Sequence, residues 1–125
     1  GMEERYRQSF EKMVELVGLM YRAGIPIEDG TDSMAGFALQ RELELDVQAG
    51  IPANKVLQDA TLGAARIMKM EGDLGSVAAG KLADLALVNG NPVADISDVR
   101  KTVLVVKDGI VYKPQELYAA LGVTP

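Results

Sequence analysis

The chain has 125 residues, 48% of them hydrophobic, and a formal net charge of -5, a balance typical of globular domains. Its 13 basic residues are dispersed, which argues against nucleic-acid binding because such binding needs a clustered basic surface. The absence of cysteine excludes disulfides and thiolate metal sites. The chain also lacks histidine, so a metal site built from it alone would depend on oxygen ligands.

No membrane association is expected, because no apolar run approaches the ~20 residues that span a bilayer. The start of the chain carries Glu3 and Glu4 instead of a basic stretch followed by an apolar core, which does not resemble a signal peptide. These features predict a cytoplasmic protein.

The first part of the chain is predicted to be rich in helices. Between Glu3 and Ala23, apolar residues recur in alternating steps of four and three, and Gly24 is a typical helix stop. This stripe is interpreted as a core-facing surface rather than a ligand site. It consists of Tyr6, Phe10, Met13, Val17 and Met20.

Three further helices are expected before Gly72. One runs from Ala35 to Ala49, and a short one starts at Ile51-Pro52, where proline is tolerated in the first turn. The third runs from Leu62 to Met70, with Thr61 as its cap.

After Asp73 the pattern changes to that of strands. Ala83 to Val88 and Val103 to Val106 are apolar runs, and Asp108-Gly109 before Ile110 to Tyr112 predicts a hairpin with a type I′ turn. A last helix is expected from Pro114 to Leu121. The class is therefore α+β, with a helix-rich segment over 1–72 and a strand-rich segment over 73–125.

The stretch Gly30-Thr31-Asp32-Ser33 is the main candidate for chemistry. It follows Ile25 to Asp29, a short segment predicted to be a strand, and precedes a helix. Asp32 or Ser33 could cap that helix. Alternatively, a carboxylate at such a corner could bind a metal or act as a general base at the mouth of a barrel. Spacing alone favours the cap, because caps are common.

Two other patterns are interpreted as structural. Ser9-Phe10-Glu11-Lys12 spells the Ser-x-x-Lys motif of acyl-transfer enzymes, but it lies on a surface helix without companion motifs. Gly75 to Gly80 matches neither a phosphate-binding nor a dinucleotide-binding loop, and it is interpreted as a turn before a strand.

Several ordered stretches resemble the end of the amidohydrolase superfamily barrel, in its imidazolonepropionase- and prolidase-related branch. These stretches are Gly30-Thr31-Asp32-Ser33, Arg41-Glu42-Leu43-Glu44-Leu45, Ala49-Gly50-Ile51-Pro52, Ala60-Thr61-Leu62-Gly63-Ala64-Ala65-Arg66, Leu74 to Leu85, and Val106 to Tyr112.

The resemblance implies the last strand and helices of a (β/α)8 barrel, followed by part of a small β-sandwich and a C-terminal helix. It makes Ile25 to Asp29 the eighth strand. It makes Asp32 the residue that, in an intact enzyme, binds zinc or another divalent metal and takes a proton from the attacking water. Such enzymes hydrolyse C–N bonds in cyclic amides, amidines or dipeptides.

The departures from the family pattern limit this expectation. The histidine ligands of the family lie on earlier strands that these 125 residues do not contain, and Gln40 stands where many relatives have histidine. Glu28 and Asp29 occupy a strand end that is usually small or apolar, and two close carboxylates need partners or protons.

We therefore expect no bound cofactor and no activity for the isolated chain. The expected partner is a second copy of the chain or a missing N-terminal barrel portion, which would cover the unpaired strand. The alternative is a non-catalytic oligomerisation or binding module that reuses the scaffold.

Overall fold

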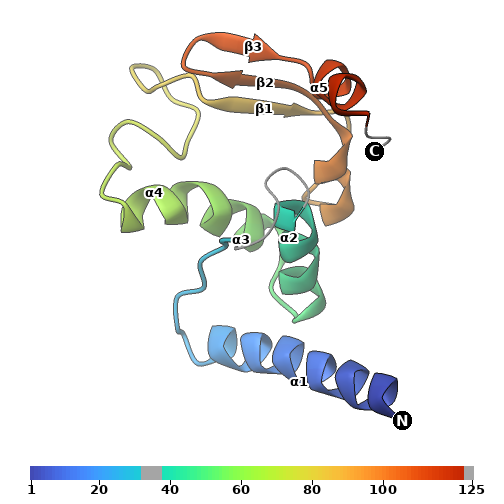
Figure 1. Cartoon of the computed structure of the whole chain (residues 1–125). Coiled ribbons are helices and arrows are strands. Elements are labelled where there is room, and N and C mark those ends of the chain that lie inside the picture. The colour runs from blue at the N-terminus through green and yellow to red at the C-terminus, as the bar shows by residue number, and fades with distance from the viewer. Residues whose placement is uncertain (32–37, 123–125) are drawn as a thin grey trace.

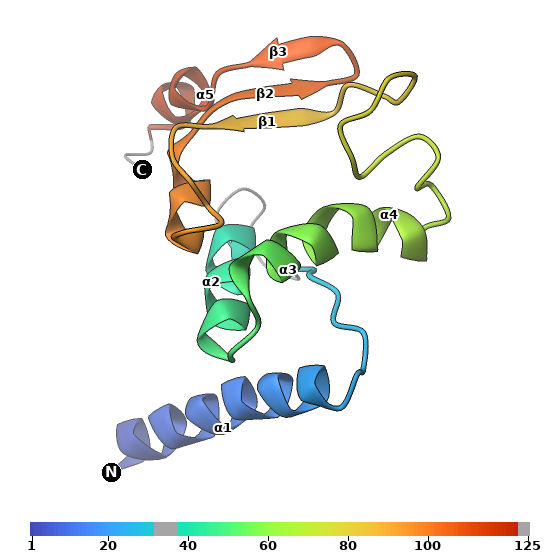
Figure 2. The ribbon, with the colours of Figure 1, turned by 180° about the vertical axis from the view of Figure 1, so that it is seen from behind.

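A computed structural model of the chain describes residues 1–31 and 38–122, and it shows helices together with a small antiparallel sheet. Figure 1 shows three tiers: helix α1 on one side, helices α2 to α4 in the middle, and the sheet with helix α5 on the other side. The view from behind shows the same order, with the sheet well separated from α1 (Figure 2). The predicted mixture of helix-rich and strand-rich segments is confirmed. The division into 1–72 and 73–125 as separate units stays a prediction.

Helix α1 spans Met2–Arg22, and the chain leaves it through Gly24 at φ 76°, as the sequence predicted. The prediction that its whole apolar stripe packs in the core is wrong. Val17 packs against the core and Gly18 is buried, but Tyr6 and Met13 are 70% and 67% exposed. The N-terminal half of the stripe stays exposed because α2 packs against α1 near the buried Gly18, which lies toward the C-terminal end of α1.

The predicted strand Ile25 to Asp29 is also wrong for the described chain. This segment lies outside any helix or strand, and the described sheet consists of three other strands. A strand requires a hydrogen-bonded neighbour, and none of the three described strands pairs with this segment.

The middle tier contains α2 (Ala38–Gln48) and α3 (Ala53–Gln58). Residues 35–37, where the second helix was expected to begin, lie outside the described part of the chain. The helix that starts with α3 continues without a break through a π-helical turn, η1 (Asp59–Gly63), into α4 (Ala64–Ile67).

The prediction that Thr61 caps a separate helix is therefore wrong. The Thr61 hydroxyl donates a hydrogen bond of 2.7 Å to the carbonyl oxygen of Leu57, one turn earlier in the same helix. A threonine hydroxyl can bond back to the preceding turn instead of capping, which explains how this residue is accommodated inside a helix.

The sheet consists of β1 (Leu85–Val88), β2 (Thr102–Lys107) and β3 (Ile110–Tyr112), in that order and all antiparallel. The three predicted strands and the hairpin are confirmed. Asp108 and Gly109 both have positive φ, 52° and 76°, as a type I′ turn requires.

Two short helices complete the sheet region. A 3₁₀ helix, η2 (Ile96–Lys101), precedes β2, and α5 (Pro114–Leu121) follows β3 and ends at Gly122 with φ 66°. The prediction of the last helix is confirmed.

The core is small and joins the middle tier to η2. Its buried residues are each 1–6% exposed; they are Leu43, Ile51, Val56 and Ile96. Ile96 comes from the strand-rich segment, so the two predicted segments share one core. Among the described residues, no helix is both long and apolar enough to cross a bilayer.

Candidate functional site

Asp32, the predicted metal ligand and general base, lies among residues 32–37 and thus outside the described residues, as does Ser33. The structure describes what flanks them: the extended segment 25–31 on one side and α2 on the other. The site is therefore built from these two elements.

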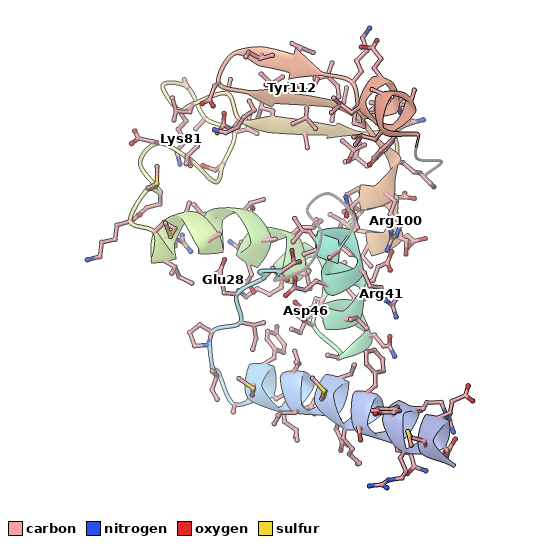
Figure 3. The ribbon with its side chains drawn as sticks, in the orientation of Figure 1. Glu28, Arg41, Asp46, Lys81, Arg100 and Tyr112 are labelled. Atoms are coloured by element: carbon pink, nitrogen blue, oxygen red, sulfur yellow. The ribbon has the colours of Figure 1, made fainter. Side chains whose placement is uncertain are left out.

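Carboxyl groups from the extended segment and from α2 lie close together. Glu28 and Asp29 lie on the extended segment, and Glu42 and Asp46 lie one turn apart on α2. Figure 3 shows Glu28 on the segment and Asp46 on the helix. The two segments are joined by a hydrogen bond of 3.1 Å from the Gly30 N–H to Glu42 Oε1. Asp46 is 8% exposed, and both carboxyl oxygens of Asp29 are buried.

This convergence changes the acidity of Asp29. Burial raises the pKa of Asp29 from its usual 3.8 to about 8, with further contributions from a hydrogen bond with Asp46 and from the charges of Asp46, Glu42 and Glu28. An ionised carboxyl group only accepts hydrogen bonds, so the contact between two carboxyl groups is favourable only when a proton lies between them. The expectation that Glu28 and Asp29 repel each other and need partners or protons stays a prediction; burial and Asp46 raise the pKa of Asp29 more than Glu28 does.

Sequence reasoning missed the role of Glu42 and Asp46, which it treated as ordinary helix residues. Their spacing of four residues places them on one face of α2, and this signal could have grouped them. It could not have shown that the face lies against Asp29, because that depends on how residues 25–31 run past the helix.

The described residues do not form a metal site on their own. Among residues 1–31 and 38–122, no group of three or more aspartates and glutamates is arranged to hold a metal ion. Asp29 and Glu42 have buried oxygens without a partner, but these acids face other acids.

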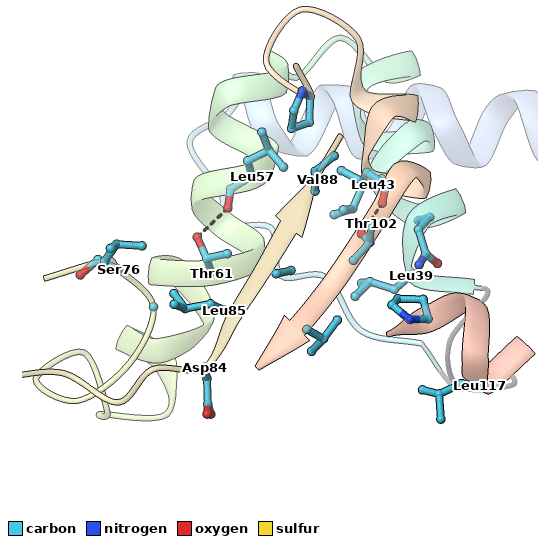
Figure 4. A pocket seen from close by; sticks show the side chains of 18 of the residues that line it. Leu39, Leu43, Leu57, Thr61, Ser76, Asp84, Leu85, Val88, Thr102 and Leu117 are labelled. Atoms are coloured by element: carbon cyan, nitrogen blue, oxygen red, sulfur yellow. Dashed lines mark hydrogen bonds between the residues drawn. The ribbon is translucent and has the colours of Figure 1, made fainter. Parts of the chain in front are cut away.

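A second feature is an apolar cavity of about 770 Å³ between the sheet and the helices. Leu57 and Thr61 line it from the helical side, Leu85 and Val88 from β1, and Leu117 from α5 (Figure 4). Most of the wall is hydrocarbon. The cavity thus offers an apolar surface against which another polypeptide segment could pack.

The sheet presents a further apolar surface. Residues paired across antiparallel strands lie on the same face, so the register places five aliphatic side chains together. We call this set the aliphatic sheet face; it consists of Leu85, Leu87, Leu104, Val106 and Val111. Leu87 and Val111 are 58% and 56% exposed, so the face is largely uncovered.

Ion pairs attach the sheet region to the helices. Arg100 of η2 binds both carboxylate oxygens of Glu44 on α2, at 2.6 and 3.0 Å, and Arg41 binds the same carboxylate at 3.2 Å (Figure 3). The Arg100 guanidinium lowers the pKa of Glu44 to about 2. This ion pair holds η2, and with it the start of β2, against α2.

Residues 7–111 match the amidohydrolase family, and the chain belongs to that family. A comparison with curated proteins finds no match.

The similar solved structures include two peptidases. One is a Xaa-Pro dipeptidase with methionine bound in its active site, 37% identical with a TM-score of 0.75; the match covers 80% of this chain and 25% of the other. The second is a putative prolidase from Bifidobacterium longum, 33% identical with a TM-score of 0.72, and the match covers 88% and 30% of the two chains.

A prolidase complexed with N-methylphosphonate-L-proline is 27% identical with a TM-score of 0.69, and the match covers 80% of this chain and 26% of the other. The chain thus spans between a quarter and a third of the length of these relatives. A portion of a prolidase-like amidohydrolase fold is therefore present.

Proposed function

We propose that this chain is the C-terminal portion of a metal-dependent, prolidase-like amidohydrolase that cleaves the C–N bond of dipeptides. The observation that carries this proposal is the 37% identity to a Xaa-Pro dipeptidase over 80% of the chain. The order of the family motifs along the sequence, from Gly30-Thr31-Asp32-Ser33 to the closing hairpin, supports the same assignment.

In this proposal Asp32 is the acid that acts in the assembled enzyme. It would be one ligand of zinc or another divalent ion and the general base toward water, a role that suits a carboxylate at the mouth of a barrel. The histidine ligands must come from outside these 125 residues, because the sequence contains no histidine.

The proposal predicts that the chain alone does not hydrolyse dipeptides. The test is to incubate the purified chain with zinc or manganese and a panel of Xaa-Pro dipeptides and simple amides, with Asp32→Asn as the matched control. No turnover above the control is expected. Robust hydrolysis that disappears in Asp32→Asn would show that the chain holds a complete site and would overturn the proposed division of ligands.

A second candidate function is an oligomerisation or binding module. The aliphatic sheet face and the exposed half of the α1 stripe favour it, because contiguous uncovered apolar surface marks an interaction site. We expect the isolated chain to form a dimer or higher oligomer in light scattering. Leu87→Lys on the aliphatic sheet face should weaken the association.

The matched control for this test is Val93→Lys. Val93 is 58% exposed, as is Leu87, and it lies in the turn after β1, outside the cavity lining and the aliphatic sheet face, so a charge there should leave the association unchanged. A stable monomer of the unmodified chain would count against self-association and leave a missing barrel portion as the partner.

A further inference from the structure

We infer that Asp29 and Asp46 share one proton and that this acid pair holds segment 25–31, which leads into Asp32, against α2. The inference deepens the proposed function by assigning two positioning residues. It rests on that function only for its consequence at Asp32, since the acid pair itself belongs to the described residues.

The geometry leaves the pair few alternatives. Asp46 is 8% exposed and belongs to the last turn of α2, while both oxygens of Asp29 are buried without any other partner among the described residues. The carboxyl oxygens of Asp29 and the side chain of Asp46 are thus shielded from water, and the two acids interact directly. Two adjacent buried carboxylates cannot both stay ionised without a compensating charge.

No such charge is available in the described surroundings. The groups that face Asp29 are Asp46 and Glu42 on α2 and Glu28 on its own segment, all of them acidic. On the neighbouring helices, Arg41 binds Glu44 and Lys55 of α3 binds Asp59. Among the described residues no cation, Arg22 of α1 included, acts on Asp29. A shared proton is therefore the means by which this contact is stabilised.

The consequence is a dependence of stability on pH with a defined sign. The pKa of Asp29 is raised from 3.8 to about 8 in the folded chain, so between these values the unfolded chain releases a proton that the folded chain keeps. The contribution of Asp29 to stability is then largest below about pH 4, falls as the pH rises, and is lost above about pH 8. A full difference of one proton changes the unfolding equilibrium constant about tenfold per pH unit.

The test is urea denaturation of the 125-residue chain between pH 5 and pH 9, followed by far-UV circular dichroism because the chain has no tryptophan. We expect the unfolding constant to rise several-fold per pH unit up to pH 8. Asp29→Asn and Asp46→Asn should each flatten this rise, since an amide donates to the remaining carboxylate without needing a proton. Glu28→Gln, at an exposed position on the same segment, should keep most of the rise, because the charge of Glu28 makes the smallest contribution to the pKa of Asp29.

A flat profile for the unmodified chain, or an unchanged rise in both Asn variants, would overturn the inference. If neither Asn variant folds, the carboxyl ¹³C resonance of Asp29 in the unmodified chain decides: titration near pH 8 supports the acid pair, and titration near pH 4 refutes it. None of these measurements uses catalysis, so the failure of the proposed hydrolase function would leave them interpretable.

Discussion

The replacement Gly18→Ala tests how α1 is attached to the rest of the chain. A Cβ atom at Gly18 would lie 2.2 Å from the carbonyl oxygen of Ala49, and ordinary C···O contacts begin near ~3.3 Å. Helix α1 would therefore have to move by roughly 1 Å away from α2. Because the opposing atom belongs to the backbone, we expect a cost near the upper end of the ~1–3 kcal/mol typical of overpacking.

Helix propensity acts in the opposite direction. Alanine in place of glycine inside a helix that makes no other contact stabilises it by about 1 kcal/mol. The expected net result is a loss of about 1–2 kcal/mol in the free energy of unfolding, which combines the overpacking cost and the propensity gain.

Urea denaturation followed by circular dichroism measures this difference. Ser9→Ala in the exposed part of α1 is the matched control, and it should stabilise the chain by a few tenths of a kcal/mol, on the order of the propensity difference. If Gly18→Ala instead stabilised the chain by about 1 kcal/mol, the close approach of α1 and α2 would not exist in solution.

Three further predictions address the remaining contacts. In urea denaturation, Gly75→Ala should destabilise the chain by about 2–4 kcal/mol and Gly80→Ala by only about 1 kcal/mol. Both glycines have positive φ, but only a Cβ atom at position 75 would meet Thr61 O and Leu62 Cα, at 2.8 Å each. Equal losses would contradict the close packing of the 71–82 loop on η1. The pKa of Glu44 is lowered from 4.5 to about 2, so the stability that Glu44 contributes should be present above pH 4.5 and be lost between pH 4.5 and 2. In an acid titration, Glu44→Gln should not show this loss of stability. Val56→Ala should cost about 2 kcal/mol, because the most buried side chain of a small core would leave a cavity; a cost below ~0.5 kcal/mol would refute that placement.

Features that depend on local signals could be predicted from the sequence. The stop of α1 at Gly24 and the turn at Asp108-Gly109 require only a backbone conformation that these residues adopt readily. The three strands of the sheet follow the same logic, because each apolar run is bounded by turn residues.

Features that depend on contacts between distant parts of the chain could not be predicted from the sequence. Ile25 to Asp29 has the composition of a strand, but a strand also needs a neighbour, and the described residues supply none. The π-helical turn that contains Thr61 lies against the loop at Gly75, and this contact has no local signal in the sequence. The same limit explains why the burial of Asp46 beside Asp29 was not foreseen.

Only part of the candidate site could be predicted from the sequence. That close carboxylates such as Glu28 and Asp29 need partners or protons could be predicted from their charge. The burial of Asp29 and its contact with Asp46 could not. The assignment of Asp32 comes from a resemblance and stays a prediction, because residue 32 lies outside the described residues.

The proposed function is tested most directly in a chimera. The part of the Xaa-Pro dipeptidase that matches this chain would be replaced by residues from this chain, so that the histidine-bearing remainder of the dipeptidase is retained, and Xaa-Pro hydrolysis would be measured with and without Asp32→Asn. We predict a folded chimera that hydrolyses Xaa-Pro dipeptides and loses at least about a hundredfold in kcat with Asp32→Asn, as removal of a general base typically does. A folded chimera without activity, or one whose kcat is unchanged by Asp32→Asn, would contradict the assignment of this chain as the aspartate-bearing portion of the enzyme.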